Sequence, residues 1–117
     1  MPPAHINLIV IYTDHRERLR DELAAFGLVF EEHQHGQGPI HDACETAGLC
    51  LEIYPASQAN PPTHIRLGLN VPNIDEAMKS ASSIDAITKA APQPSPWGIR
   101  AVIQLRSGIK VELSQPS

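Results

Sequence analysis

The sequence lacks the features that mark nucleic-acid-binding, membrane and secreted proteins. It has nine Lys and Arg residues against thirteen Asp and Glu, a net charge of -4, and no run of basic residues that would hold nucleic acid. No apolar stretch approaches the roughly 20 residues of a membrane-spanning helix. The N-terminus has neither the basic start nor the cleavage site of a secretory signal. We therefore expect a cytoplasmic protein that binds neither nucleic acid nor membranes.

Cysteine and aromatic residues are also scarce. The two cysteines, Cys44 and Cys50, flank an expected turn, and nothing in their spacing requires a disulfide, so we expect free thiols. Aromatic residues make up 4% of the chain, which argues against a site that stacks a large planar ligand. A chain of 117 residues fits one domain with one core.

The second half of the sequence repeats the pattern of the first. When His5 is placed over His64, "HINLIVIY" at 5–12 lies over "HIRLGLNV" at 64–71. After a single-residue insertion, Glu52 lies over Glu112. The agreement is one of pattern more than identity and runs through nearly the whole chain, so it indicates two copies of one structural unit.

Each copy has the pattern of a strand, a helix and three further strands. An Asp14–Glu17 pair and an Asn73–Glu76 pair are typical of helix starts, because the first side chain caps free backbone N–H groups. We expect one domain over 1–117, with module one at about 4–57, a connector at 58–63 and module two at about 64–115. The expected strands are 5–12, 28–34, 40–45, 49–54, 64–71, 86–90, 99–105 and 109–113, the expected helices are 14–27 and 74–82, and 92–98 is expected to be a Pro-rich rim loop.

Alternation along the strands separates an apolar face from a polar one. Two histidines, His5 and His64, and two carboxylates, Glu52 and Glu112, are predicted to lie on the polar face, away from the helices. The residues expected to pack on the helices are Ile6, Leu8, Val10, Leu51, Ile53, Ile65, Leu67, Leu69, Val71, Ile109, Val111 and Leu113.

If the sheet is curved, these four polar residues would converge on a shared point. Two carboxylates in such a place would repel each other and lose hydration, and a divalent cation would remove both costs. Two imidazoles and two carboxylates suit Zn, Ni, Co, Mn or Fe, and suit calcium less well. The alternative is that both glutamates are solvated strand residues and the histidines are incidental.

The pattern resembles the vicinal oxygen chelate superfamily, which includes glyoxalase I, extradiol dioxygenases and bleomycin resistance proteins. The resemblance implies an α+β fold in which two βαβββ modules pair into a cup-shaped, partly open β-barrel with the helices outside. It also implies metal ligands on the first and last strand of each module, which are His5, Glu52, His64 and Glu112 in this sequence. A full His, Glu, His, Glu set is most similar to glyoxalase I, and the family further implies a homodimer.

The first hypothesis is therefore a metal-dependent lyase or isomerase. The ion would bind two vicinal oxygens of a small substrate and stabilise an enediolate, with Glu52 or Glu112 as the base. Arg66 would hold an anionic group of the substrate. The other candidate substrate-binding residues are Asn7, Asn70 and Trp97.

The second hypothesis is a metal-free, bleomycin-type resistance or small-molecule-binding protein, and a ring-cleaving dioxygenase is a third. For three of the other histidines we expect a structural role or exposure to solvent. "HQH" at 33–35 resembles a metal clip but is expected to be solvated loop, and His41 is expected to be a hydrogen-bonded structural residue.

Overall fold

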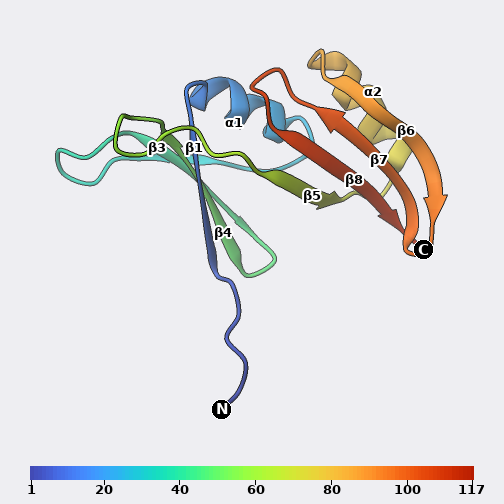
Figure 1. The fold of residues 1–117 in the computed structure, drawn as a ribbon, viewed down its shortest axis with the longest axis horizontal. Coiled ribbons are helices and arrows are strands. Elements are labelled where there is room, and N and C mark those ends of the chain that lie inside the picture. The colour runs from blue at the N-terminus through green and yellow to red at the C-terminus, as the bar shows by residue number, and fades with distance from the viewer. The chain divides into compact units, whose positions relative to one another are not determined.

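The computed structural model describes all residues from 1 to 117, and the chain divides into two units, Met1–Thr63 and His64–Ser117. Each unit has the order strand, helix, strand, strand, strand, so the predicted pair of βαβββ modules is confirmed (Figure 1). No helix is long and apolar enough to cross a membrane. The homodimer and the cytoplasmic location stay predictions.

Unit 1 consists of a four-stranded sheet with one helix against it. Its elements are β1 (Leu8–Thr13), α1 (Arg16–Ala24), β2 (Glu31–His33), β3 (His41–Thr46) and β4 (Leu49–Pro55). The strand order is β1-β4-β3-β2, with β1 parallel to β4 and the other neighbours antiparallel.

Unit 2 repeats this arrangement. Its elements are β5 (Arg66–Asn70), α2 (Ile74–Ser83), β6 (Ile87–Ser95), β7 (Gly98–Gln104) and β8 (Lys110–Pro116). The strand order is β5-β8-β7-β6, with β5 parallel to β8. In each unit the first strand therefore forms one edge of the sheet, and the last strand lies beside it.

The helix-packed face of β1 differs from the prediction. Ile11 is fully buried, whereas Ile6 and Leu8 are 74% and 47% exposed. Ile11 pairs with Ile53 of β4, and Val10 pairs with Glu52. Because paired residues point to the same side of a sheet, Ile11 and not Val10 lies on the helix-packed face. The predictions for β4 and β8 are confirmed, since Leu51, Ile53, Ile109, Val111 and Leu113 are all buried.

The start of α1 also differs from the prediction, which placed the helix cap at Asp14. The N-cap of α1 is His15, which makes no side-chain capping bond, and Asp14 is exposed. The Thr13 hydroxyl accepts a hydrogen bond from the His15 backbone N–H at 3.0 Å instead. In α2 the predicted cap is confirmed, because Asn73 Oδ1 accepts from the Glu76 N–H at 3.0 Å. The cap residue His15 of α1 therefore corresponds to Asn73 of α2. This correspondence shifts the first strand by one residue relative to the alignment of His5 with His64. The shift explains why both the buried face of β1 and the start of α1 differ from the predictions.

The Pro-rich segment is a strand rather than the predicted loop. Residues 92–95 belong to β6, and the turn to β7 contains Pro96 and Trp97. β6 is an edge strand of its sheet, and edge strands tolerate proline because their outer N–H groups need no ladder partner. Trp97 is 76% exposed, so it does not pack in the core of unit 2.

Candidate functional site

The face of the unit 1 sheet opposite α1 carries several carboxylate, imidazole and thiol side chains. Glu52 on β4 pairs with Ala43 on β3, and Ala43 pairs in turn with Glu31 on β2. Glu45 pairs with Cys50. These pairs point away from the helix-packed residues Leu51 and Ile53 because neighbouring strand residues alternate between faces.

A partly open cavity of about 430 Å³ lies on this face. Its lining combines three carboxylates, one imidazole, one thiol and two small apolar side chains: Val29, Glu31, His33, Ala43, Glu45, Cys50 and Glu52. The lining contains no Lys or Arg, and its volume falls in the range of small-molecule sites. The cavity is therefore ligand-sized and acidic.

The thiol in this cavity is not an activated nucleophile. Burial, together with the negative charge of Glu52 and Glu45, raises the pKa of Cys50. Burial also raises the pKa of Cys44, and both cysteines are free, as expected. A thiol with a raised pKa stays protonated at neutral pH, which makes it a poor nucleophile.

His41 lies next to the cavity lining in an enclosed environment. Its ring stacks on Tyr54, with the ring centroids 4.2 Å apart and the planes 6° from parallel. His41 Nδ1 donates to the Pro39 carbonyl oxygen at 3.2 Å. Nε2 is buried and makes no hydrogen bond, although Glu52 Oε2 lies 3.5 Å away.

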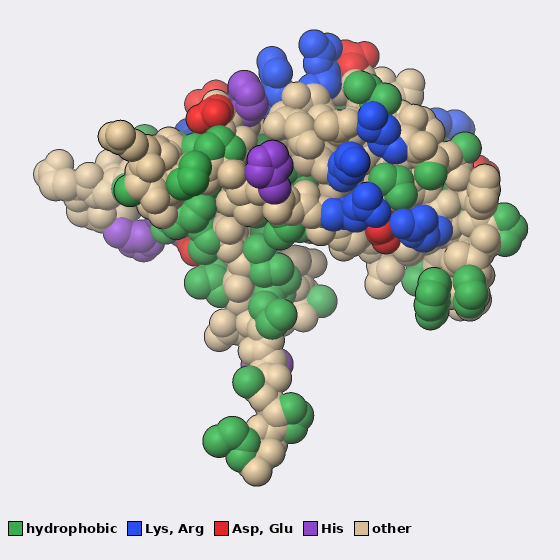
Figure 2. Space-filling model, viewed as in Figure 1, with side chains coloured by type: hydrophobic (Ala, Val, Ile, Leu, Met, Phe, Trp, Pro, Cys, Tyr) green, Lys and Arg blue, Asp and Glu red, His purple; other side chains and the backbone are tan.

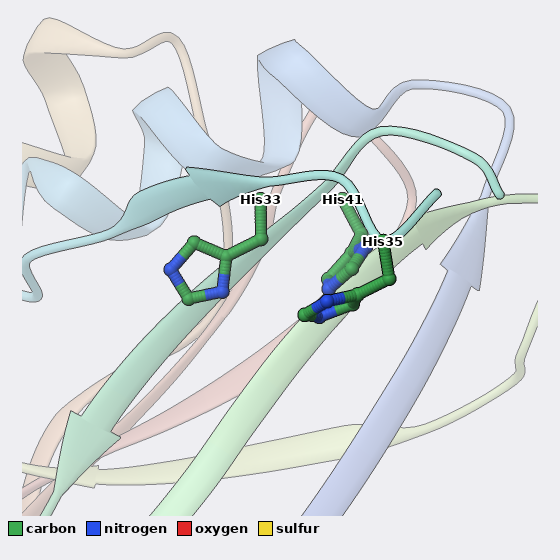
Figure 3. A group of neighbouring side chains, drawn as sticks. All are labelled: His33, His35 and His41. Carbon is green, nitrogen blue, oxygen red and sulfur yellow. The ribbon is translucent and has the colours of Figure 1, made fainter. Parts of the chain in front are cut away.

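Two further histidines lie beside His41. His33 on β2 pairs with His41 on β3, and His35 follows in the loop between these strands. One ring nitrogen from each of the three lies within 4.8 Å of the others, and Figure 3 shows the three rings grouped at one end of the hairpin. These residues could hold a metal ion. The prediction that 33–35 is only solvated loop missed this cluster, because the β2–β3 register that adds His41 is not visible in the spacing.

The corresponding face of unit 2 is cationic. Arg66 on β5, Arg100 on β7 and Lys110 on β8 lie on the face opposite α2, around the single carboxylate of Glu112. Arg66 Nη1 and Arg100 Nη2 donate to Glu112 Oε1 at 2.8 and 2.7 Å, and Arg100 Nε donates to Oε2 at 3.3 Å. Figure 2 shows Lys and Arg side chains gathered around one acidic side chain on unit 2. Arg66 therefore holds a carboxylate of the protein itself, and its contact with an anionic group of a substrate stays a prediction.

The two guanidinium groups change the titration of Glu112. Hydrogen bonds from Arg100 and then Arg66 lower its pKa from 4.5 to about 2. Because the folded-state pKa is lowered, the stabilisation from this carboxylate is complete above pH 4.5 and is lost as the pH falls toward 2.

We expect carboxyl-carbon NMR of the folded protein to show Glu112 titrating near pH 2, and Arg100→Ala to raise that midpoint toward 4.5. Lys110→Ala is the matched control, since Lys110 lies on the same face without an ion pair to Glu112, and it should shift the midpoint much less. A wild-type midpoint near 4.5 would contradict the ion-pair geometry.

The other predicted site residues lie at or beyond the strand ends. His5 and Asn7 precede β1 and are exposed, although the Asn7 carbonyl accepts from the Cys50 N–H at 2.9 Å. His64 precedes β5 and is exposed, and Asn70 is exposed at the end of β5. His5 and Glu52 belong to unit 1, and His64 and Glu112 belong to unit 2. The two pairs come from different units, and the shared four-ligand metal site stays a prediction.

Comparison with known proteins identifies the fold. No family profile and no curated protein sequence matches the chain. Among solved structures, an antibiotic-binding protein, TnmS3 from Streptomyces sp. CB03234, matches with a TM-score of 0.75 and 21% identity over 100% of this chain and 99% of its own. A glyoxalase/bleomycin resistance protein/dioxygenase family enzyme from Burkholderia phytofirmans PsJN matches with a TM-score of 0.75 and 16% identity over 97% of this chain and 100% of its own.

A lactoylglutathione lyase from Agrobacterium tumefaciens also matches, with a TM-score of 0.67 and 15% identity over 98% of this chain and 96% of its own. The chain therefore has the fold of the glyoxalase/bleomycin resistance/dioxygenase proteins. These neighbours include both binding proteins and enzymes, so the fold does not choose between the two hypotheses.

Proposed function

We propose that this chain binds a small organic molecule carrying a cationic amine, in the acidic cavity of unit 1. The observation that carries this proposal is a ligand-sized cavity lined by Glu31, Glu45 and Glu52 and by no Lys or Arg. Three carboxylates on one face repel each other, and a bound cation relieves that repulsion. Val29 and Ala43 supply the apolar contact that organic ligands need.

One of the structural neighbours has a binding role. The match to TnmS3, which is described as an antibiotic-binding protein, extends over the whole chain. The acidic lining further favours ligands with amine groups over neutral or anionic ones, because charge-assisted hydrogen bonds to carboxylates are roughly twice as strong as neutral ones. The ligand class follows from the cavity and not from the neighbour.

The lyase hypothesis has less support, because the surroundings of Glu112 do not suit a metal ligand or a general base. Its carboxylate is occupied by Arg66 and Arg100, whose positive charges also repel a cation. With a pKa of about 2, this carboxylate is a weak proton acceptor at neutral pH. A lyase would therefore depend on Glu52 as its base, with a metal ion that Glu112 does not help to hold.

A small organic diamine such as hexane-1,6-diamine, which carries two cationic groups and fits a cavity of about 430 Å³, is a suitable probe of the binding proposal. We expect isothermal titration calorimetry to show stoichiometric binding that weakens as NaCl is raised, because the attraction is between charges. Glu45→Gln should weaken binding by roughly tenfold or more, the effect of losing one charged hydrogen bond. Ala43→Phe should abolish binding by filling the cavity.

Glu17→Gln is the matched control, since Glu17 is an exposed carboxylate on α1, and binding should be unchanged. A diamine that fails to bind, or that binds equally well to Ala43→Phe, contradicts the proposed site. The lyase alternative predicts metal-stimulated turnover of the methylglyoxal–glutathione adduct. We expect no such turnover, and an activity that is lost in Glu52→Gln would favour the lyase instead.

A further inference from the structure

We propose that His33, His35 and His41, at one end of the β2–β3 hairpin, form a binding site for a divalent transition metal such as Zn²⁺, Ni²⁺ or Co²⁺. This site differs from the four-ligand site predicted at His5, Glu52, His64 and Glu112. It lies entirely within unit 1, so it does not depend on how the two units are arranged.

The spacing of the three imidazoles is close to that of a metal site. One nitrogen of each ring lies within 4.8 Å of the others. Zn–N bonds of about 2.0–2.1 Å in a tetrahedral site place the nitrogens roughly 3.3 Å apart, so the rings must approach by up to about 1.5 Å. His35 can make this movement because it is exposed and lies in the loop at 34–40, which contains Gly36 and Gly38.

His41 has the features of a metal ligand. Its Nδ1 donates to the Pro39 carbonyl, so Nε2 is the ring nitrogen that is open to a metal ion. Metal-binding histidines generally donate their other ring N–H to a carbonyl or carboxylate in this way. Nε2 is a buried nitrogen without a hydrogen-bond partner, which is an unfavourable state that a metal ion would relieve. Stacking on Tyr54 holds the ring in place.

His33 is held by a carboxylate in a similar manner. Its Nε2 lies 3.3 Å from Glu31 Oε2, which leaves Nδ1 as the nitrogen available to an ion. Figure 3 shows one nitrogen of the His33 ring on the side toward His35 and His41. A carboxylate behind a histidine ligand orients the ring and raises its basicity. Two of the three histidines therefore already have the supporting contacts of a metal site.

The donor set indicates the kind of metal. Three neutral nitrogens suit Zn²⁺, Ni²⁺ and Co²⁺, whereas Mg²⁺ and Ca²⁺ prefer oxygen ligands. Glu52, whose Oε2 lies 3.5 Å from His41 Nε2, is positioned to supply a fourth ligand or to hold a bound water. An ion there would tie the 34–40 loop to β3.

This inference does not rest on the proposed small-molecule function, and its test uses no organic ligand. Protein without an affinity tag is stripped with a chelator and titrated with ZnCl₂ by calorimetry and with CoCl₂ by visible absorption. We expect one equivalent of each metal to bind, and the Co²⁺ bands to have the intensity of a tetrahedral site. Zn²⁺ should also raise the melting temperature, because it binds only the folded hairpin.

Single variants locate the site. His35→Ala and His33→Ala should each weaken Zn²⁺ binding by about a hundredfold, because each removes one of the three ligands, and should abolish the Zn²⁺-dependent rise in melting temperature. Both residues lie outside the buried core, so these variants should fold even if His41→Ala does not. His5→Ala and His64→Ala are the matched controls and should bind Zn²⁺ as the wild type does.

Two results would overturn the inference. One is a wild-type protein that binds none of Zn²⁺, Ni²⁺ and Co²⁺ at 1:1 stoichiometry. The other is metal binding that survives His33→Ala and His35→Ala, or that is lost in His5→Ala and His64→Ala, which would place the ion at the four-ligand site instead. A failed metal test leaves the binding of the small diamine unaffected, so the two proposals can fail separately.

Discussion

Asp42→Asn is expected to destabilise the protein by about 3 kcal/mol, the low end of the range for breaking a buried ion pair. Asp42 is fully buried on β3, and its Oδ2 lies 2.7 Å from Arg16 Nη1 at the start of α1. Arg20 Nη1 lies 3.6 Å from Oδ1, within ion-pair range but without hydrogen-bond geometry. An amide keeps the shape of the side chain but leaves the largely buried Arg16 without its closest counter-charge.

Urea unfolding monitored by circular dichroism measures this change, and a loss of 3 kcal/mol corresponds to a drop in melting temperature of roughly 10 °C for a chain of this size. The matched control is Glu32→Gln. Glu32 also contacts Arg16, at 3.5 Å, but its side chain is 54% exposed, so its loss should cost less than about 1 kcal/mol. Equal effects of the two variants would show that Asp42 does not anchor α1 to the sheet.

Gly98→Ala is expected to destabilise the protein by about 3 kcal/mol or more, since it adds backbone strain to a steric clash. Gly98 begins β7 with φ of +126°, a conformation that residues with a Cβ rarely adopt. A Cβ at this position would lie 2.1 Å from the Gln115 carbonyl oxygen of β8. The clash also affects α2, because Gln115 Oε1 accepts from the Ile74 N–H at 2.8 Å at the start of that helix.

Gly108→Ala separates the two contributions. Gly108 has φ of +103°, but a Cβ there meets nothing within 4 Å, so only the backbone cost of about 1–2 kcal/mol applies. Gly68→Ala has neither cost and should change the free energy of unfolding by less than about 1 kcal/mol. A Gly98→Ala variant no less stable than Gly108→Ala would show that β7 and β8 can separate at this end without loss.

The charge distribution connects the fold to the proposed function. The two units have the same topology, yet the face opposite the helix is acidic in unit 1 and cationic in unit 2. Glu52 and Glu112 occupy matching positions on β4 and β8 but have different surroundings. Glu52 lies beside His41 and the acidic cavity, whereas Glu112 is held by two arginines. Equivalent positions in the repeat therefore do not have equivalent chemistry.

The sequence pattern was sufficient for the order of elements and most of their bounds. Helix α2 was predicted at 74–82 and spans Ile74–Ser83, because its cap and apolar spacing are local features. The predicted register of the first strand and the predicted cap of the first helix were off by one residue, because Asp14 resembles a cap as closely as Asn73 does. Only the pairing of Ile11 with Ile53 decides which residues of β1 reach the core.

By itself, the sequence determined two βαβββ units and the outward direction of Glu52 and Glu112, because strand alternation and helix periodicity are properties of neighbouring residues. Only the tertiary structure decided which side chains contact each carboxylate. The β2–β3 register brings His33 to His41, and the β5–β8–β7 register brings Arg66 and Arg100 to Glu112. Such contacts join residues far apart in the chain, and their electrostatic effect depends on distances that sequence spacing does not contain.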